Sequence, residues 1–311
     1  MAASLRLGTR GSQLALRQAA LVRDALLARH PGLAVELTAI STHGDRAAEV
    51  PLHLLSGQGV FARAIEEALL DGRVDMAVHS LKDLPSVETP GLEIAAVPPR
   101  EDARDALVSR GGVPFAALPP GARVATGSPR RAAQLRAARP DLQIVDIRGN
   151  LDTRLRKLEQ DDLDALVLAV AGLRRLGLAD RIAEALPTAL CLPAVGQGAL
   201  AVQCRAADAA TRALVAPLDD AASHAAVRAE RALLAALGGG CKVPIAAHAE
   251  AHGEELHLHG MVAAPDGSQV IRDSLTAPLA AAALLGMGLA ARLMAAGAGD
   301  LLAGGGAPAE A

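Results

Sequence analysis

Strands and helices alternate along much of this chain, with a turn of small or polar residues between a strand and the helix that follows it. The first example is a predicted strand over residues 5–9, a turn at Arg10-Gly11-Ser12 and a predicted helix over residues 13–29. Such alternation is typical of α/β folds, in which helices pack on a mostly parallel sheet. From residue 243 onward the pattern instead predicts strands, a hairpin turn at Pro265-Asp266-Gly267 and a final helix.

Short apolar runs mark the predicted strands, and apolar residues at helical spacing mark the helices. The strands span residues 5–9, 35–40, 74–78, 92–97, 106–109, 123–125, 142–147, 165–170, 199–204, 243–249, 256–263 and 268–273. The helices span residues 13–29, 60–70, 129–138, a segment with Arg154 and Lys157, 219–237 and 279–296. Two crossings, near residues 98–105 and 192–198, divide these elements. We expect a first domain of residues 1–98 and 199–216, a second of 104–192 and a third of 221–311.

Composition indicates a soluble globular protein, because 51% of the 311 residues are hydrophobic, 21% are charged and the net charge is −3. No apolar run is expected to reach the length of a membrane span, and the N-terminus lacks the layout of a secretion signal. These features predict a cytoplasmic protein with no membrane partner. Two aromatic residues are too few for nucleic-acid binding by base stacking. Three scattered cysteines predict neither a disulfide framework nor a metal site.

Arginine follows several predicted strand ends. Arg10 lies before the helix that Ser12 caps, an arrangement that forms either an anion site or only a capped helix with a surface arginine. In Thr126-Gly127-Ser128-Pro129-Arg130-Arg131, a serine N-cap and a proline precede two arginines that oppose the helix dipole, which favours an anion there. Arg148 and Arg175 follow two further strands. The recurrence predicts a polyanionic ligand at the sheet edge.

The polar run His79-Ser80-Leu81-Lys82-Asp83 follows the predicted strand over residues 74–78. Ligands of doubly wound sheets bind beyond the carboxyl ends of strands, so chemistry is expected here. A carboxylate with a cation beside it stays ionised and can stabilise a positive charge. The alternative interpretation is a solvated surface turn.

A glycine run, Gly238-Gly239-Gly240, precedes Cys241 and removes every side chain before the thiol. Glycine is used where the backbone bends freely or approaches a ligand closely, so the thiol would be presented to a ligand. The alternative is a helix C-cap with a tight turn and a small buried cysteine.

Six segments, in order, resemble the porphobilinogen deaminase family, whose members are hydroxymethylbilane synthases. The resemblance runs from about Leu5 to Arg272. The motifs are Leu-Gly-Thr-Arg-Gly-Ser from Leu7, Ala-Val-His-Ser-Leu-Lys-Asp-Leu-Pro from Ala77, Gly-Ser-Pro-Arg-Arg from Gly127, Ile-Arg-Gly-Asn from Ile147, Leu-Pro-Ala-Val-Gly-Gln-Gly from Leu192 and Gly-Gly-Cys-Lys-Val-Pro from Gly239.

The resemblance implies an α/β protein with two domains like those of periplasmic binding proteins and a smaller α/β third domain with an antiparallel sheet. It implies a transferase that joins four porphobilinogen molecules head to tail, releases ammonia each time and frees the linear tetrapyrrole by hydrolysis. The reaction would start on a covalent dipyrromethane cofactor, held by a thioether to Cys241. Porphobilinogen carries an acetate and a propionate, which matches the arginines. The resemblance also leads us to expect a monomer.

Asp83 matches the family's catalytic carboxylate, which would stabilise the cation left on the substrate when ammonia departs. The positions that match cofactor or substrate carboxylate binding are Arg10, Ser12, Ser80, Lys82, Thr126, Ser128, Arg130, Arg131, Arg148, Arg154 and Arg175. Gln58 departs from the family pattern, because many relatives have a lysine at this position.

Two other functions are compatible with parts of the sequence. A non-catalytic carboxylate-binding protein of the same plan would explain the arginines but neither Asp83 in its motif nor the glycine-flanked cysteine. A thiol enzyme would use Cys241 as nucleophile, with His248 or His79 as the candidate base. Alkylation separates these views, because a cysteine blocked by a thioether cannot react.

Overall fold

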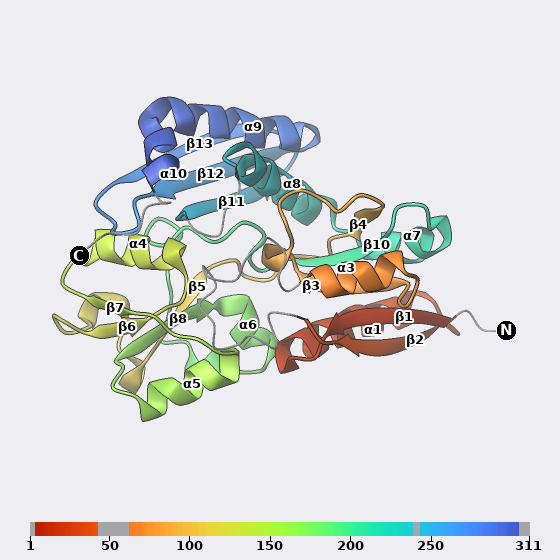
Figure 1. Ribbon diagram of the computed structural model, residues 1–311, viewed down its shortest axis with the longest axis horizontal. Helices are drawn as coiled ribbons and strands as arrows, with labels where there is room; N and C mark the ends of the chain where they lie inside the picture. The colour runs from red at the N-terminus through yellow and green to blue at the C-terminus, as the bar shows by residue number, and fades with distance from the viewer. Residues whose placement is uncertain (1–3, 43–61, 239–242, 305–311) are drawn as a thin grey trace.

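The computed structural model describes residues 4–42, 62–238 and 243–304. Within these residues the strands form three sheets, and each sheet with its helices is called a unit below (Figure 1). The first and second units carry five-stranded mixed sheets, and the third carries a three-stranded antiparallel sheet. The expected α/β class, with two similar sheets and a smaller antiparallel one, is confirmed.

The first unit has the strand order β2-β1-β3-β10-β4. Its elements are β1 (Ser4–Arg10), β2 (Ala34–Ile40), β3 (Met76–Ser80), β4 (Leu92–Ala96), β10 (Leu200–Arg205), α1 (Gln13–Arg29), α3 (Arg63–Leu70) and α7 (Ala209–Val215). β1 is parallel to β2 and β3, and β10 is antiparallel to β3 and β4. Because side chains of a strand alternate between faces, Met76 and Val78 pack in the core beneath α1, whereas Ala77 packs with α3.

The second unit repeats this pattern in the order β7-β6-β8-β5-β9. Its elements are β5 (Asp105–Ser109), β6 (Arg123–Ala125), β7 (Gln143–Val145), β8 (Ala165–Ala169), β9 (Glu184–Ala185), α4 (Pro129–Ala138), α5 (Leu151–Gln160) and α6 (Val170–Arg175). β6 is parallel to β7 and β8, and β5 is antiparallel to β8 and β9. Ala106 and Val108 face α5, and Leu107 shares the other face with Leu135 of α4.

Two crossings, residues 97–104 and 186–199, join the first and second units. Each leads into the antiparallel strand next to the sheet's edge, β5 in the second unit and β10 in the first. The crossings touch where the Glu101 amide donates to the Gly198 carbonyl at 3.3 Å. Gly198 has φ +89, and a Cβ there would lie 2.2 Å from the Glu101 carbonyl oxygen, so this contact requires glycine.

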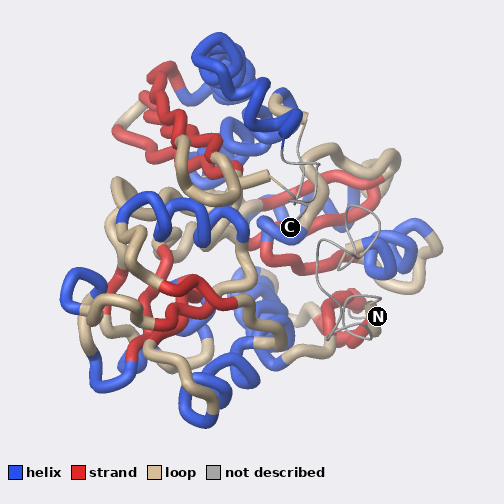
Figure 2. The backbone as a smooth tube through the Cα atoms, turned by 60° about the vertical axis from the view of Figure 1, so that its left-hand side comes forward, coloured by secondary structure: helices blue, strands red, loops and turns tan. Residues whose placement is uncertain are grey.

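The third unit packs a sheet, β11-β12-β13, under two helices. Its elements are β11 (Ile245–His252), β12 (Glu255–Ala263), β13 (Val270–Pro278), α8 (Ala221–Ala236), α9 (Ala282–Leu293) and α10 (Gly299–Gly304). Leu256, Leu258 and Val262 face α8 and α9, whereas Met261 packs with Ala133 of α4. The helices therefore cover the face of the sheet that points away from the second unit (Figure 2).

The expectation that no apolar run reaches the length of a membrane span was wrong. By length and composition the helical segment Leu279–Ala303, 25 residues long, could cross a membrane. Its residues Leu285, Leu289 and Leu293 are instead part of the third unit's hydrophobic core. The pattern also missed α6, α7 and β9, which are short, whereas α1 and β6 have the predicted bounds.

Candidate active site

The first unit brings its predicted residues together at one sheet edge. β1 ends at Arg10 and the parallel neighbour β3 ends at Ser80, so the turns that follow lie side by side. Asp83 closes the 3-10 turn Leu81–Asp83, and its carboxylate lies 3.9 Å from the Arg10 guanidinium. Ser12 is the N-cap of α1, where its Oγ accepts the amide of Ala15 at 3.4 Å. The turn predicted as an anion site thus faces the predicted catalytic carboxylate.

A solvent-open pocket lies at this edge, and Arg10, Ser12 and Asp83 line it. Ser80 also lines it and donates through Oγ to the amide oxygen of Gln18 at 3.0 Å. His79 lies deeper, where burial lowers its pKa to about 4, so its ring is neutral at physiological pH. The pocket therefore combines a cation, a carboxylate and hydroxyl groups.

Lys82 extends from the same turn toward the second unit. Its ammonium donates to the side-chain oxygen of Gln197 at 3.2 Å. The side chain is exposed by area, but protein groups crowd the ammonium; this desolvation and the charge of Arg131 lower its pKa to about 8. An anionic ligand would stabilise the charged form of Lys82.

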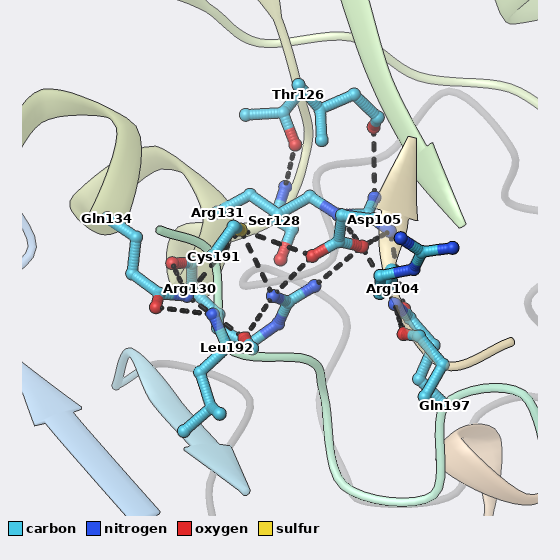
Figure 3. A network of polar contacts seen from close by, with 12 residues as sticks. Arg104, Asp105, Thr126, Ser128, Arg130, Arg131, Gln134, Cys191, Leu192 and Gln197 are labelled. Carbon is cyan, nitrogen blue, oxygen red and sulfur yellow. Dashed lines mark hydrogen bonds and ion pairs between the residues drawn. The ribbon is translucent and has the colours of Figure 1, made fainter. Parts of the chain in front are cut away.

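In the second unit, Arg130 and Arg131 lie in the first turn of α4 and both bind Asp105 (Figure 3). Nη1 of Arg130 donates to Asp105 at 2.7 Å, and Nη2 of Arg131 donates to it at the same distance. Asp105 begins β5 and, by alternation, shares the face of Leu107, which packs against α4. Burial alone would raise the pKa of Asp105, but the two arginines hold it well below its usual range.

These two arginines are buried, at 5% and 6% exposure, and they also contact backbone. Arg130 donates to the Leu192 carbonyl at 2.7 Å and Arg131 to the Val167 carbonyl at 3.0 Å. The sequence predicted an anion at this helix start, and the anion that both side chains contact in the structure is Asp105. Binding of cofactor or substrate by either arginine stays a prediction.

The loop before α4 is held by its own polar groups. The Thr126 hydroxyl accepts the backbone amide of Ser128 at 3.3 Å, and the Thr126 amide donates to Val145 at 2.9 Å. Ser128 occupies the N-cap position and Pro129 the first turn, as predicted. In the described part of the chain, however, the Ser128 hydroxyl makes no capping hydrogen bond. That hydroxyl is therefore available to a ligand.

Two further arginines of the second unit hold charge that protein carboxylates neutralise poorly. Arg148 Nε has no hydrogen-bond partner within the described residues and lies 3.6 Å from the carboxylate of Asp146. Arg154 donates to the Gly149 carbonyl at 2.8 Å. Burial, followed by repulsion from Arg131 and Arg148, lowers the pKa of Arg154 to about 10. Lys82, Arg131, Arg148 and Arg154 thus form a cation cluster.

The last predicted arginine, Arg175 at the end of α6, donates to the Gly198 carbonyl at 2.6 Å. Burial lowers its pKa, while Glu101 opposes that shift. Arg175 therefore contacts the second crossing. Cys241 and Gln58 lie outside the described residues.

The sequence analysis missed two buried polar residues of this region, Asp105 and Gln197. The sequence pattern places Asp105 only in a crossing, and the motif that contains Gln197 indicates no role for it. The one available signal was an acidic residue at the start of an apolar strand, which is unusual for a position that is then fully buried.

The fold and the site together define a class of protein. Two α/β units of the same topology share two crossings and place a cation cluster beside the Asp83 carboxylate, as expected of an α/β protein that binds and acts on a polyanion.

Comparisons with known proteins identify the family. The model described as "Porphobilinogen deaminase, dipyromethane cofactor binding domain" matches residues 5–213, and that of the "Porphobilinogen deaminase, C-terminal domain" matches residues 224–295. The porphobilinogen deaminase of Syntrophotalea carbinolica is 54% identical over 96% of this chain and 95% of its own. That of Roseiflexus castenholzii is 52% identical over 97% and 99%. This chain belongs to the porphobilinogen deaminase family.

Solved structures of lower similarity include periplasmic binding proteins. The methionine-binding protein MetQ matches with a TM-score of 0.42 and 13% identity, over 69% of this chain and 89% of its own. The arginine-binding protein STM4351 of Salmonella typhimurium matches with a TM-score of 0.40 and 16% identity, over 72% and 94%.

Proposed function

We propose that this chain is a hydroxymethylbilane synthase, which joins four porphobilinogen molecules head to tail, releases ammonia at each step and frees the linear tetrapyrrole by hydrolysis. Family membership over nearly the whole chain supports this activity. The structural observation that carries it is the cation cluster beside Asp83. Each added pyrrole unit brings two carboxylates, so a growing product supplies the anions that the cluster lacks.

The residues present fit a dipyrromethane cofactor, the group that the family implies. The depressed pKa values of Lys82 and Arg154 and the unpartnered Nε of Arg148 mark places for carboxylates. The Ser128 and Ser12 hydroxyl groups can also donate to carboxylate oxygens. When bound, the cofactor supplies the nucleophilic pyrrole carbon to which the first substrate is joined.

Asp83 carries the chemistry in this proposal. Its carboxylate lies in the open pocket, 3.9 Å from the Arg10 guanidinium. A fixed negative charge beside the substrate stabilises the cation that forms when the aminomethyl group loses ammonia. Arg10 also lies where it can bind a substrate carboxylate, which would place the reacting carbon next to Asp83.

Cys241 is the proposed attachment residue for the cofactor, through a thioether. The sequence supports this role, since the family motif Gly-Gly-Cys-Lys-Val-Pro stands at Gly239. The other two cysteines, Cys191 and Cys204, are fully buried, and burial raises the pKa of Cys191 to about 12. A buried thiol of raised pKa is a poor nucleophile, which leaves Cys241 as the candidate.

The intact mass of the purified chain, beside that of a Cys241→Ala variant, tests the proposal. We expect the parent to exceed its sequence mass by two linked pyrrole units and the variant to show no excess. If the parent is unmodified, it is incubated with porphobilinogen and weighed again. A chain that neither gains this mass nor consumes porphobilinogen contradicts the proposed function, and a Cys241 that alkylates freely throughout favours the thiol enzyme.

We further infer a domain division of residues 1–98 with 199–216, 104–192 and 221–311, and a monomeric, cytoplasmic protein. The three sheets and their crossings support the division. Light scattering of the purified chain across a concentration series tests the monomer: a mass that rises above 31.6 kDa with concentration contradicts it.

A further inference from the structure

Gln197 lies in the second crossing, is 1% exposed, and uses both ends of its side-chain amide. Its Nε2 donates to the Ala103 carbonyl at 2.7 Å and to Asp105 at 2.8 Å. Its Oε1 accepts from Lys82 at 3.2 Å and from Arg131 at 3.3 Å. The Gln197 amide therefore joins the first crossing, the start of β5, the turn that carries Lys82 and the first turn of α4.

The chemistry of these partners fixes the orientation of the amide. Ala103 offers a carbonyl and Asp105 a carboxylate, which only accept hydrogen bonds, whereas Lys82 and Arg131 only donate. A flipped amide would place donor against donor and acceptor against acceptor. Of the uncharged side chains, glutamine has the length and the two-ended polarity for this position.

We propose that Gln197 is a positioning residue for the reaction, which holds the Lys82 ammonium beside Asp83 and the Arg131 guanidinium of the opposite unit so that both point to one bound carboxylate ligand. The carboxylate ligand in this role rests on the proposed function, whereas the hydrogen bonds of Gln197 do not depend on it. Because Gln197 lies in a crossing, it also ties the position of Lys82 to the relative placement of the two units.

The position of Lys82 can be followed through its titration. The charged groups that face it are Arg131, Asp83, Asp105 and Arg130, and Gln197 supplies an oxygen between them. An oxygen that accepts from an ammonium stabilises its charged form. Removal of that oxygen should make Lys82 easier to deprotonate, and a carboxylate in its place should make it harder.

The test uses the full chain with carbon-13 labelled lysine, followed by NMR across a pH titration. The sequence has three lysines, Lys82, Lys157 and Lys242, so the spectrum is simple, and a Lys82→Arg variant assigns the signal. For Gln197→Leu we expect the pKa of Lys82 to fall by about one unit, and for Gln197→Glu to rise by about one unit. A purely structural role would not produce opposite shifts.

A matched control is Gln203→Leu, which removes another buried amide, one that donates to Glu66 at 3.1 Å. It should leave the Lys82 titration unchanged. The proposal would be overturned if the pKa of Lys82 were unchanged in both Gln197 variants or shifted in the same direction in both. If Gln197→Leu does not fold, Gln197→Met removes the amide at similar length and takes its place beside Gln197→Glu.

Activity provides a second, separable readout. The rate of porphobilinogen consumption should fall on the alkaline side at a pH that follows the pKa of Lys82. This pH should be lower in Gln197→Leu and higher in Gln197→Glu. A parent chain that consumes no porphobilinogen would contradict the proposed function, whereas the NMR titration would still decide the role of Gln197.

Discussion

The first and second units have the same topology but place charge differently at the sheet edge where their parallel strands end. In the first unit Asp83 is partly exposed, and the Arg10 guanidinium lies 3.9 Å from its carboxylate. In the second unit Asp105 is fully buried and binds two arginines at 2.7 Å. The Asp83 carboxylate is therefore accessible from the open pocket, whereas the Asp105 carboxylate is paired within the protein.

The difference shows how a repeated fold divides its work. The two sheets supply the same edge geometry. In the proposed function, the first unit presents a carboxylate for chemistry and the second presents arginines for substrate carboxylates. Asp105 neutralises part of the positive charge of Arg130 and Arg131, and this permits several arginines to be packed together in the second unit. Arg148 and Arg154 keep the remaining surplus.

The largest effect expected from the comparison is on catalysis. Asp83→Asn keeps the size and polarity of the side chain but removes its charge, so the cation on the substrate loses its stabilisation. We expect the rate of porphobilinogen consumption to fall about a thousandfold or more. The free energy of unfolding should be unchanged within about 1 kcal/mol. Turnover kinetics and urea unfolding measure both. Normal turnover would remove Asp83 from the mechanism.

The same change in the second unit should act on stability. Asp105→Asn leaves Arg130 and Arg131 buried with no carboxylate between them, which costs about 3–4 kcal/mol of unfolding free energy. Asp162→Asn is the control, because that carboxylate pairs with Arg123 at 93% exposure and should cost less than about 1 kcal/mol. Equal losses in the two variants would refute the contrast.

Acid should affect the two units in different pH ranges. The pKa of His79 in the folded first unit is about 4, below its usual 6.5, so the unfolded chain binds a proton first as pH falls. The free energy of unfolding that neutral His79 contributes is fully present above pH 6.5. About 3 kcal/mol of it is lost as the pH falls toward 4. The pKa of Asp105 is lowered in the folded protein, so protonation of Asp105 reduces stability only below its usual pKa near 3.8.

Urea unfolding of the parent and a His79→Gln variant, at about pH 7 and about pH 4.5, tests this order. The variant should lose less stability than the parent between the two conditions. If both lose the same amount, His79 does not titrate in the way that its burial implies.

Local pattern was sufficient for most of the fold. Apolar periodicity and caps predicted α1 and β6 with their observed bounds, and the turn at Gly267 joins β12 and β13 as expected. α6 and α7 were missed because six or seven residues give too few helical turns for a periodic signal.

The site was predictable in its residues but less so in its pairings. A strand end followed by arginine is a local signal, and it led to Arg130 and Arg131. Their partner Asp105 is 25 residues away, and only the position of β5 beside β8, with α4 across that face, brings them together. The role of Gln197 likewise depends on both crossings, which no single segment of sequence contains.

The smallest expected effect separates charge kept for a ligand from charge neutralised within the protein. Arg154→Met removes a partly buried cation whose pKa of about 10 reflects burial and repulsion by Arg131 and Arg148. Relief of that repulsion should raise the unfolding free energy by about 1 kcal/mol, while the KM for porphobilinogen rises about tenfold. Arg156→Met, at an exposed position of the same helix, should change neither. A less stable Arg154→Met variant with unchanged KM would mean that this arginine serves the fold, as Arg130 does in its pair with Asp105.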